Sequence, residues 1–299
     1  MSSVEARELL EDPSADVRDA VAVASGVPEP IDKIWFHKTA AAVIDAGRCV
    51  GCGGCIAACP SRSISVGTDG NPTLTKMCTG CSACWDYCPL AGFRSERLAR
   101  EGQPDPTDDV GTVIGAYSAS ALARPDRAQD GGTVTALLAA LLEAGHIDGV
   151  ILTRRRDAFH GESFLATTPS QVLEGAGSVY HQSHPLEVLN REVPDDVERL
   201  AFVGTPCQLT VLRALQRFPW RYRRTAAHAV VLTVGLFCSR SFDPTKLMRS
   251  MLERGTDISQ VGRIDIREGQ LVAESRDGSS EILRGPVKEF REASLRGCD

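Results

Sequence analysis

The chain has 299 residues, a formal net charge of −6, 42% apolar and 24% charged residues. This composition is typical of a soluble globular protein with one or two domains and excludes a disordered or fibrous chain. The acidic balance and 5% aromatic content argue against a protein that binds nucleic acid through bulk positive charge or base stacking. The sequence shows neither a secretory signal nor an apolar run of about 20 residues, so we expect a cytoplasmic protein without a membrane span.

Residues 1–44 are expected to form an N-terminal extension that is helical in part. Trp35, Phe36 and His37 near its end are candidates for docking it on the segment that follows. A single histidine in such a place is more often structural or solvated than a ligand, so His37 receives no chemical role.

Eight of the 11 cysteines lie between Cys49 and Cys88, in two copies of one pattern. Each copy reads C-x2-C-x2-C-x3-C-P, the run that binds [4Fe–4S] clusters in bacterial ferredoxins. Thiolates at these spacings wrap three corners of a cubane, and the proline after the fourth cysteine turns the chain away. In two-cluster ferredoxins this fourth cysteine ligates the other cluster. We therefore assign the first cluster to Cys49, Cys52, Cys55 and Cys88, and the second to Cys78, Cys81, Cys84 and Cys59.

The repeat predicts a two-[4Fe–4S] ferredoxin domain over residues 45–92, which relays electrons and is not itself a substrate site. Its glycines at positions 51, 53, 54 and 80 are expected to let the backbone approach inorganic sulfide. Paired C-x2-C units also occur in zinc ribbons, but two complete copies with the third cysteine and the Cys-Pro favour iron–sulfur clusters. Dense cysteines in a reducing compartment bind metal or do redox chemistry and seldom form disulfides.

Residues 93–111 are polar and rich in proline, so we expect a linker there. In the remaining segment, 112–299, a helix with an apolar stripe at i, i+3, i+4, i+7 and i+8 begins at Thr133, and a hairpin turns at Glu268–Gly269. Short apolar runs predict strands at 112–117, 149–153, 200–203 and 229–236. The whole chain therefore predicts an α+β ferredoxin-like two-cluster module followed by an α/β domain.

Two features of the α/β domain indicate a ligand site. Cys207 and Cys238 each follow a predicted buried strand, and open α/β sheets bind ligands at the carboxyl ends of their strands. Gly131, Gly132 and Thr133 precede or open a helix, where bare backbone amides favour a phosphate. Ordinary interpretations remain, because buried cysteines are usually inert and a Gly-Gly pair before a helix is weak evidence by itself.

Five segments of the chain, 129–138, 147–151, 177–180, 202–208 and 235–238, carry the motifs of one family. In them the chain resembles the β subunits of coenzyme F420-reducing hydrogenases and dehydrogenases. With the ferredoxin repeat, the resemblance covers residues 45–299. It implies an iron–sulfur flavoprotein oxidoreductase whose domain 112–299 binds FAD. Such a protein passes electrons between coenzyme F420 and [4Fe–4S] clusters, to or from a partner subunit or ferredoxin.

The resemblance also implies roles for individual residues. Gly131, Gly132 and Thr133 would hold the FAD phosphates, and the flavin would be lined by Ser178, Tyr180, Thr205 and Pro206. Family cysteines that ligate a further [4Fe–4S] cluster match Cys207, Cys238 and Cys298. Family members continue with another cysteine, whereas this chain ends at Asp299. Either the domain is shortened at its C-terminus or the third cluster lacks one protein ligand.

Two alternative functions stay open at this stage: a ferredoxin-linked reductase of another small organic substrate, and a pure electron-transfer subunit of a larger complex. No catalytic residue is assigned, because hydride transfer between cofactors needs no protein nucleophile. His181 and His184 lie beside the flavin segment, and we expect solvated loop histidines there in preference to proton shuttles.

Overall fold

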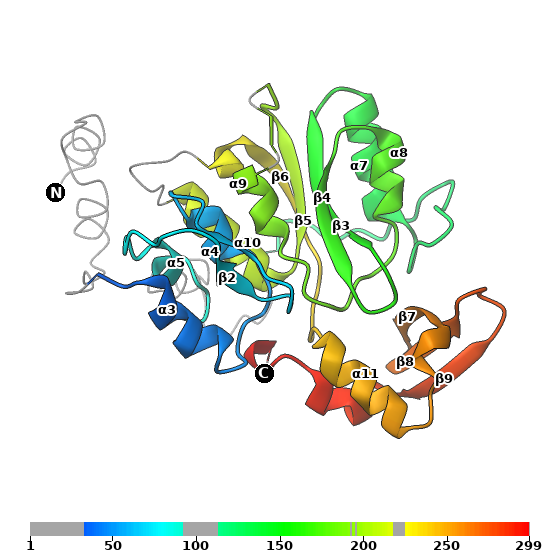
Figure 1. Ribbon diagram of the computed structural model, residues 1–299. Helices are drawn as coiled ribbons and strands as arrows, with labels where there is room; N and C mark the ends of the chain where they lie inside the picture. Colours follow the sequence, from blue (N-terminus) through cyan, green and yellow to red (C-terminus); the bar gives the residue numbers. More distant parts are fainter. Residues whose placement is uncertain (1–32, 92–112, 192, 195, 218–224, 299) are drawn as a thin grey trace.

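The computed structural model describes residues 33–91, 113–191, 193–194, 196–217 and 225–298. The expected linker at 93–111 and most of the expected N-terminal extension lie outside these residues. The described part contains a small cysteine-rich module, a four-stranded sheet with helices on both faces, and a C-terminal lobe (Figure 1). No helix in it is long and apolar enough to cross a membrane.

The cysteine module places one short helix after each cysteine loop. The end of the expected extension packs on this module as predicted, since Phe36 is buried against Ile56 and Ile64. His37 is exposed, in agreement with a solvated side chain. The elements are α3 (Phe36–Thr39), η1 (Ala40–Ile44), α4 (Gly54–Ala58), β1 (Ile64–Val66), β2 (Pro72–Leu74) and α5 (Ala83–Asp86).

The central sheet has the strand order β4-β3-β5-β6, in which β3, β5 and β6 run parallel and β4 is an antiparallel edge. It confirms an α/β domain, with a mixed sheet. Its strands are β3 (Gly149–Arg155), β4 (Gly161–Ala166), β5 (Leu200–Gly204) and β6 (Val230–Gly235). Its helices are α7 (Thr133–Glu143), α8 (Pro169–Glu174), η2 (Pro185–Glu187), α9 (Val188–Arg191), α10 (Pro206–Arg217) and η3 (Ala226–Ala229).

The strand expected at 112–117 is wrong: residues 113–117 form no strand, and Val113 and Tyr117 are 63% and 94% exposed. Apolar residues alone do not make a strand, because its N–H and C=O groups need a neighbouring strand. The strand expected at 229–236 is present as β6, but it is an edge strand and Val231 is 62% exposed.

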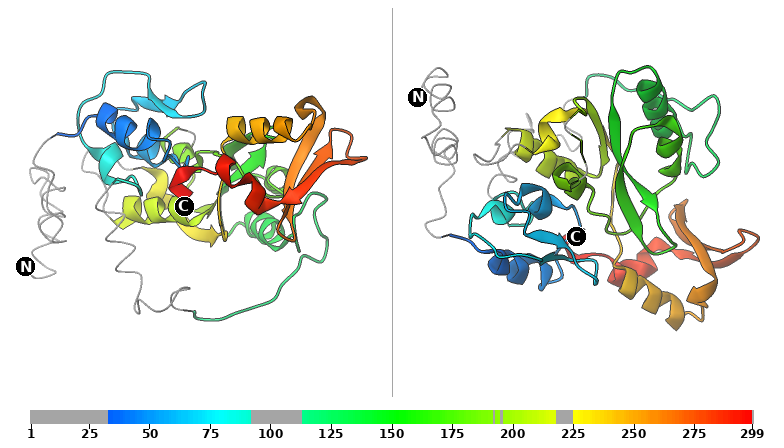
Figure 2. Two further views of the ribbon diagram at one scale, coloured as in Figure 1. Left: turned by 90° about the horizontal axis from the view of Figure 1, so that it is seen from below. Right: turned by 45° about the horizontal axis from the view of Figure 1, so that its top comes forward.

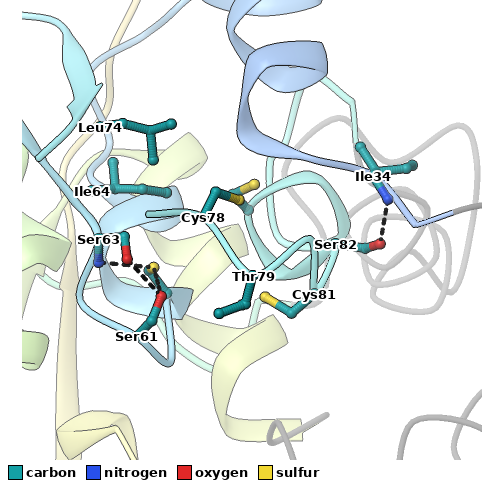
Figure 3. Close-up of a pocket in the computed structure, with 11 residues that line it drawn as sticks. Ile34, Ser61, Ser63, Ile64, Leu74, Cys78, Thr79, Cys81 and Ser82 are labelled. Atoms are coloured by element: carbon teal, nitrogen blue, oxygen red, sulfur yellow. Dashed lines mark hydrogen bonds between the residues drawn. The ribbon is translucent and has the colours of Figure 1, made fainter. Parts of the chain in front are cut away.

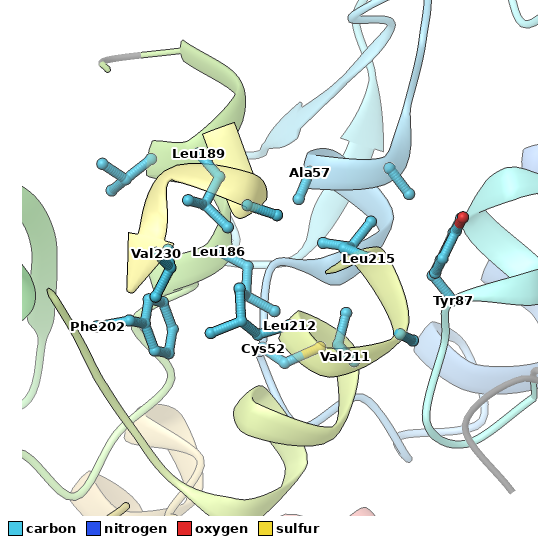
Figure 4. Packing of buried hydrophobic residues seen from close by; sticks show 14 of the residues in the cluster. Cys52, Ala57, Tyr87, Leu186, Leu189, Phe202, Val211, Leu212, Leu215 and Val230 are labelled. Carbon is cyan, nitrogen blue, oxygen red and sulfur yellow. The ribbon is translucent and has the colours of Figure 1, made fainter. Parts of the chain in front are cut away.

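Strand β3 separates two hydrophobic cores, because alternate side chains of a strand point to opposite faces. Val150 and Leu152 pack with α7 and α8, whereas Ile151 packs on the other face. That second core combines α10 and η2 with α4 of the cysteine module, where Ala57 is fully buried (Figure 4). The cysteine module and the α/β domain therefore share one continuous core.

The C-terminal lobe is built on an antiparallel sheet of order β7-β8-β9, and it contains the hairpin expected at Glu268–Gly269. The last turn, η6, returns to the cysteine module (Figure 2). There Gly297 lies directly against the Arg48 carbonyl. The elements are α11 (Pro244–Glu253), η4 (Ile258–Gln260), β7 (Val261–Arg267), β8 (Gln270–Ser275), β9 (Glu281–Pro286), η5 (Val287–Ala293) and η6 (Arg296–Cys298).

Candidate iron–sulfur and flavin site

The two cysteine loops have corresponding backbone turns. Gly51 and Gly80 have φ of +62° and +68°, and two residues later Gly53 and Ser82 have φ of +79° and +64°. Gly53 and Ser82 then serve as the N-caps of α4 and α5. Left-handed backbone is free of strain only for glycine, so Ser82 is held there by its surroundings. The sequence repeat is therefore also a structural repeat.

A small hollow lies beside the second loop (Figure 3). Three of the cysteines that line it come from the second copy of the motif and one from the first copy, as the crossover requires. Among the described residues, no three His, Cys, Asp or Glu side chains form a site for a single metal ion. The lining thiols are Cys59, Cys78, Cys81 and Cys84, the four that the sequence assigns to the second cluster.

Polar groups around this hollow point at the sulfur atoms. The Ser63 N–H donates to Cys59 Sγ at 3.3 Å, and the Gly80 N–H donates to Cys78 Sγ at 3.4 Å. Donors of this kind stabilise negative charge on sulfur and are a main control of cluster potential. The donor set and the hollow thus fit a thiolate-ligated iron–sulfur cluster.

A second group contains Cys49, Cys52, Cys55 and Cys88. Burial raises the pKa of the Cys49 thiol to about 11, the Gly51 N–H opposes this, and the charge of Cys88 adds to the rise. Burial also raises the pKa of Cys52 and Cys55 well above the usual value, and both respond to the charge of Cys88. The fourth cysteine of the second motif copy therefore lies with the first three of the first copy.

The three cysteines outside the ferredoxin motif come together next to this first group. Burial raises the pKa of Cys207, the Thr205 hydroxyl opposes the shift, and the charges of Cys298 and Cys238 add to it. Cys207 in turn raises the pKa of Cys49 and Cys52. A series of thiols thus leads from the carboxyl edge of the sheet into the first group.

A segment of the α/β domain, residues 182–186, lies along the first cysteine loop and is called the strap below. Gln182 Nε2 donates to the Cys49 carbonyl at 3.0 Å. The His184 N–H donates to the Gly51 carbonyl at 2.9 Å, and the Leu186 N–H reaches the Cys52 carbonyl at 3.3 Å. Three consecutive bonds therefore connect the strap to the loop that carries Cys49, Cys52 and Cys55.

The strap also explains two of the loop glycines. A Cβ atom on Gly51 would lie 2.6 Å from the Gln182 side chain, and one on Gly53 would lie 2.7 Å from the His184 carbonyl oxygen. The sequence interpretation, backbone approach to sulfide, misses this reason, because the contacting residues lie more than 130 positions away. Glycine is needed here for close approach of another backbone as well as for a left-handed turn.

The second loop is covered by a different segment. The Trp35 ring lies on Gly80, where a Cβ atom would be 2.9 Å from the ring. The Ile34 N–H donates to the Ser82 hydroxyl at 2.9 Å. The N-terminal segment therefore occupies the position over the second loop that the strap occupies over the first.

The expectation that His181 and His184 are solvated is wrong, since they are 7% and 4% exposed. His181 Nε2 lies 3.2 Å from the Ala158 carbonyl, and His184 Nε2 lies 2.8 Å from the Gly70 carbonyl. Because a carbonyl only accepts, each Nε2 carries the proton. Burial lowers the pKa of His181 to about 4 and also lowers the pKa of His184, so both rings are neutral at pH 7.

The predicted phosphate-binding residues, Gly131 to Thr133, lie at the start of α7. Gly132 is the N-cap, with φ of +71° and no side-chain capping bond. The first amides of α7 therefore stay available to an anion. Nearby, Gln129 Nε2 donates to the Ile266 carbonyl at 2.7 Å, and the Ile266 N–H donates to the Tyr180 hydroxyl at 3.2 Å. The loop before α7 and the predicted flavin residue Tyr180 thus meet at β7.

A cluster of arginines surrounds the buried carboxylate of Asp265 on β7. Arg263, Arg267 and Arg155 approach it at 2.6, 2.9 and 3.2 Å. Arg155, the last residue of β3, also donates to the carbonyl of the predicted flavin residue Ser178 at 2.8 Å. Burial lowers the pKa of Arg155, but arginine remains charged in proteins. The excess of cations fits an anionic ligand such as a diphosphate.

The sequence interpretation misses Arg155 and Arg263, because arginines in strands usually mark a solvated face. Thr205 and Pro206 lie farther along the same carboxyl edge, at the start of α10, where the Thr205 hydroxyl is 3.3 Å from Cys207 Sγ. The structure therefore groups Thr205 with the thiols. It groups Ser178 and Tyr180 with the arginines and with the loop before α7.

Comparison with known proteins gives family matches over both parts of the chain. The family described as coenzyme F420 hydrogenase/dehydrogenase, beta subunit N-term, matches residues 116–190, and its C-terminus counterpart matches residues 197–299. A 4Fe-4S dicluster domain matches residues 41–103.

Individual relatives come from methanogenic archaea. The coenzyme F420 hydrogenase subunit beta of Methanothermobacter thermautotrophicus is 31% identical, over 62% of this chain and 68% of that protein. A subunit of the F(420)H(2) dehydrogenase of Methanosarcina mazei is 26% identical, over 86% of this chain and 72% of its own length. The coenzyme F420-dependent sulfite reductase of Methanocaldococcus jannaschii is 29% identical, over 86% of this chain but only 40% of that protein.

A solved structure is similar as well. A chain of the F420-reducing [NiFe] hydrogenase complex from Methanosarcina barkeri matches with a TM-score of 0.51 and 27% sequence identity. The match covers 57% of this chain and 59% of that chain.

Proposed function

Because the chain belongs to the family of coenzyme F420 hydrogenase/dehydrogenase β subunits and carries a 4Fe-4S dicluster domain, we propose that it is an FAD-containing oxidoreductase that exchanges electrons between coenzyme F420 and a protein partner. F420-linked electron transfer is the chemistry common to its named relatives. The sulfite reduction named for one relative is not assigned here, because the chain covers 40% of that protein. The partner is a further subunit or a ferredoxin.

One observation carries the proposal: the cysteine groups form a continuous series from the carboxyl edge of the sheet to the hollow beside the second cysteine loop. Cys207 is close enough to Cys49 and Cys52 for its charge to raise the pKa of both. Cys55 responds in the same way to Cys84 of the second group. A chain that only held structural metal would have no need of such a series.

FAD, when bound, supplies hydride exchange with F420 on one side and single-electron exchange with iron–sulfur clusters on the other. Gly131, Gly132 and Thr133 would hold its phosphates together with Arg155 and Arg263, which supply positive charge. The ring system would be lined by Ser178, Tyr180, Thr205 and Pro206. Since His181 is buried and neutral at pH 7, its contribution is packing beside this site and not proton donation.

Cys207, Cys238 and Cys298 would hold a further [4Fe–4S] cluster between the flavin and the first cluster. They come from three separate elements, α10, the segment after β6, and η6. The charges of Cys298 and Cys238 both raise the pKa of Cys207, and the charge of Cys207 raises the pKa of Cys49, which supports this arrangement.

Anaerobic addition of reduced F420 to the purified protein tests the proposal. We expect the flavin and cluster absorbance to bleach together with oxidation of F420. A protein that dithionite reduces fully, but that reduced F420 leaves unchanged, would instead be a pure electron-transfer subunit or a reductase of another substrate.

The cofactor assignment has its own control. Arg263→Gln should lower the FAD released by acid precipitation while iron and sulfide contents stay unchanged, because Arg263 belongs to the proposed phosphate site and not to a cysteine group. Arg276→Gln is a matched control, since Arg276 is exposed on the same lobe.

A further inference from the structure

The hollow beside the second cysteine group has a basic rim. Lys33 precedes the lining residue Ile34, Arg62 lies between the lining residues Ser61 and Ser63, and Lys76 lies two positions before Cys78. These three cations, Lys33, Arg62 and Lys76, are exposed and are called the basic rim below.

The charge of this rim is opposite to that of the chain. The chain has a net charge of −6, yet the described segments 33–38, 61–63 and 74–82 contain no aspartate or glutamate. Asp69 lies in the turn of the β1–β2 hairpin, at the end opposite to the paired residues Ile64 and Leu74 that line the hollow. The positive charge is thus concentrated where the second group approaches the surface.

Apolar side chains stand beside these charges. Met77 is 88% exposed, Trp35 is 42% exposed and Leu74 is 39% exposed. Exposed methionine and tryptophan inside a charged rim are typical of a protein-binding patch. The hollow itself is lined by Leu74, Ile34 and the second-group thiols (Figure 3).

In the described part of the chain, the first group is covered by segments of the α/β domain and the C-terminal turn. The strap covers its loop, α4 is buried against α10, and η6 closes on the Arg48 carbonyl. Of the two ferredoxin groups, the second is therefore the one that a protein collecting electrons can approach from the side of the basic rim.

From this arrangement we propose that the rim and its apolar patch form the docking site for a small acidic electron-carrier protein, such as a negatively charged bacterial ferredoxin. Opposite charge raises the encounter rate and orients the carrier, while a small patch keeps the complex short-lived. In each encounter one electron leaves the reduced second cluster for the oxidised cluster of the carrier, with no bond broken and no proton moved. The proposal rests on the proposed function only for the source of electrons, reduced F420.

Charge reversal at Lys76 tests the site, with an acidic two-[4Fe–4S] bacterial ferredoxin as the probe. Lys76→Glu should weaken binding in calorimetry at low salt by about tenfold or more, and the loss should shrink as salt rises. Lys288→Glu is the matched control, because Lys288 is exposed on η5 of the C-terminal lobe and the change in net charge is the same. Equal affinities for the two variants would overturn the proposal.

Footprinting gives a readout that does not depend on electron transfer. Oxidation of Met77 by hydroxyl radicals should fall when the ferredoxin is added, whereas oxidation of exposed residues on the C-terminal lobe should not change. Unchanged oxidation of Met77 in the presence of bound ferredoxin would place the carrier elsewhere. The proposal would also be overturned if the natively purified complex contained a permanent partner protein that protects Met77 and excludes the ferredoxin. Failure of reduced F420 to reduce the protein would leave both measurements intact, so the two proposals fail separately.

Discussion

The two cysteine loops share a sequence pattern and left-handed turns at corresponding positions, yet different parts of the chain cover them. The strap from the α/β domain bonds to three backbone carbonyls of the first loop. The second loop receives the Trp35 ring and one bond from the Ile34 N–H to a serine hydroxyl, and it borders an open hollow. The two copies of the motif therefore have different surroundings: the first copy faces the α/β domain and the second faces the surface.

Removing a crossover ligand should produce the largest effect. Cys88→Ser should damage the cluster bound by Cys49, Cys52 and Cys55, while Cys59→Ser should damage the other cluster, because the fourth cysteine of each copy serves the opposite group. Electron paramagnetic resonance of the reduced variants distinguishes the two losses. If each serine variant lost the cluster of its own motif copy, the crossover would be refuted.

Gly53→Ala should come next, with a destabilisation of about 3 kcal/mol or more. The added Cβ meets the His184 carbonyl oxygen at 2.7 Å and the Glu187 nitrogen at 2.9 Å, both backbone atoms, at a φ of +79°. Thermal loss of the first cluster's signal measures the effect. Ser82→Ala is the matched control in the second loop, since that position already holds a Cβ atom. This variant should keep its second cluster on heating as the wild type does.

The protein should lose stability in acid because of His181, the residue that precedes the strap. The folded pKa of His181 is about 4, below its ordinary value of 6.5, so the unfolded chain binds more protons between these two pH values. Stability is therefore complete above pH 6.5 and falls as the pH drops below it, by about 1 kcal/mol at pH 5.5. Urea unfolding of wild type and His181→Gln at pH 5.5 and 7.5 checks this. Equal pH dependence in the two proteins would remove His181 as the cause.

The smallest expected effect is on potential. In a trans peptide the C=O and the N–H point in opposite directions. The bond from Gln182 to the Cys49 carbonyl therefore directs the N–H of the same peptide, that of Val50, away from the strap. Gln182→Leu should release that amide and lower the first cluster's potential by about 20 to 40 mV, the equivalent of less than 1 kcal/mol for one electron. A redox titration followed by electron paramagnetic resonance provides the second cluster as internal reference. A shift of both potentials by the same amount would contradict a role of the strap.

Local patterns predicted much of this molecule. Cysteine spacing predicted which thiols line the hollow beside the second loop, and apolar runs predicted β3, β5 and β6, because both signals act over a few residues. Contacts between distant residues were not predictable in this way. Gln182 and Cys49 are 133 positions apart, and nothing near either residue in the sequence indicates the other.

The errors have the same origin. Residues 113–117 have the composition of a strand but no strand beside them. His181 and His184 have the setting of loop residues but are buried by the C-terminal lobe and the cysteine module. Arg155 and Arg263 form ion pairs with the same carboxylate, that of Asp265, only because β3 and β7 meet there in the fold.

The difference between the two loops is tested most directly by freeze-quench electron paramagnetic resonance after mixing with reduced F420. The Cys78→Ser variant, which lacks an intact second cluster, should still reduce its first cluster. In Cys55→Ser, the second cluster should stay oxidised, since we propose that the first cluster connects it to the FAD of the α/β domain. Reduction of the second cluster in Cys55→Ser at the wild-type rate would contradict the account.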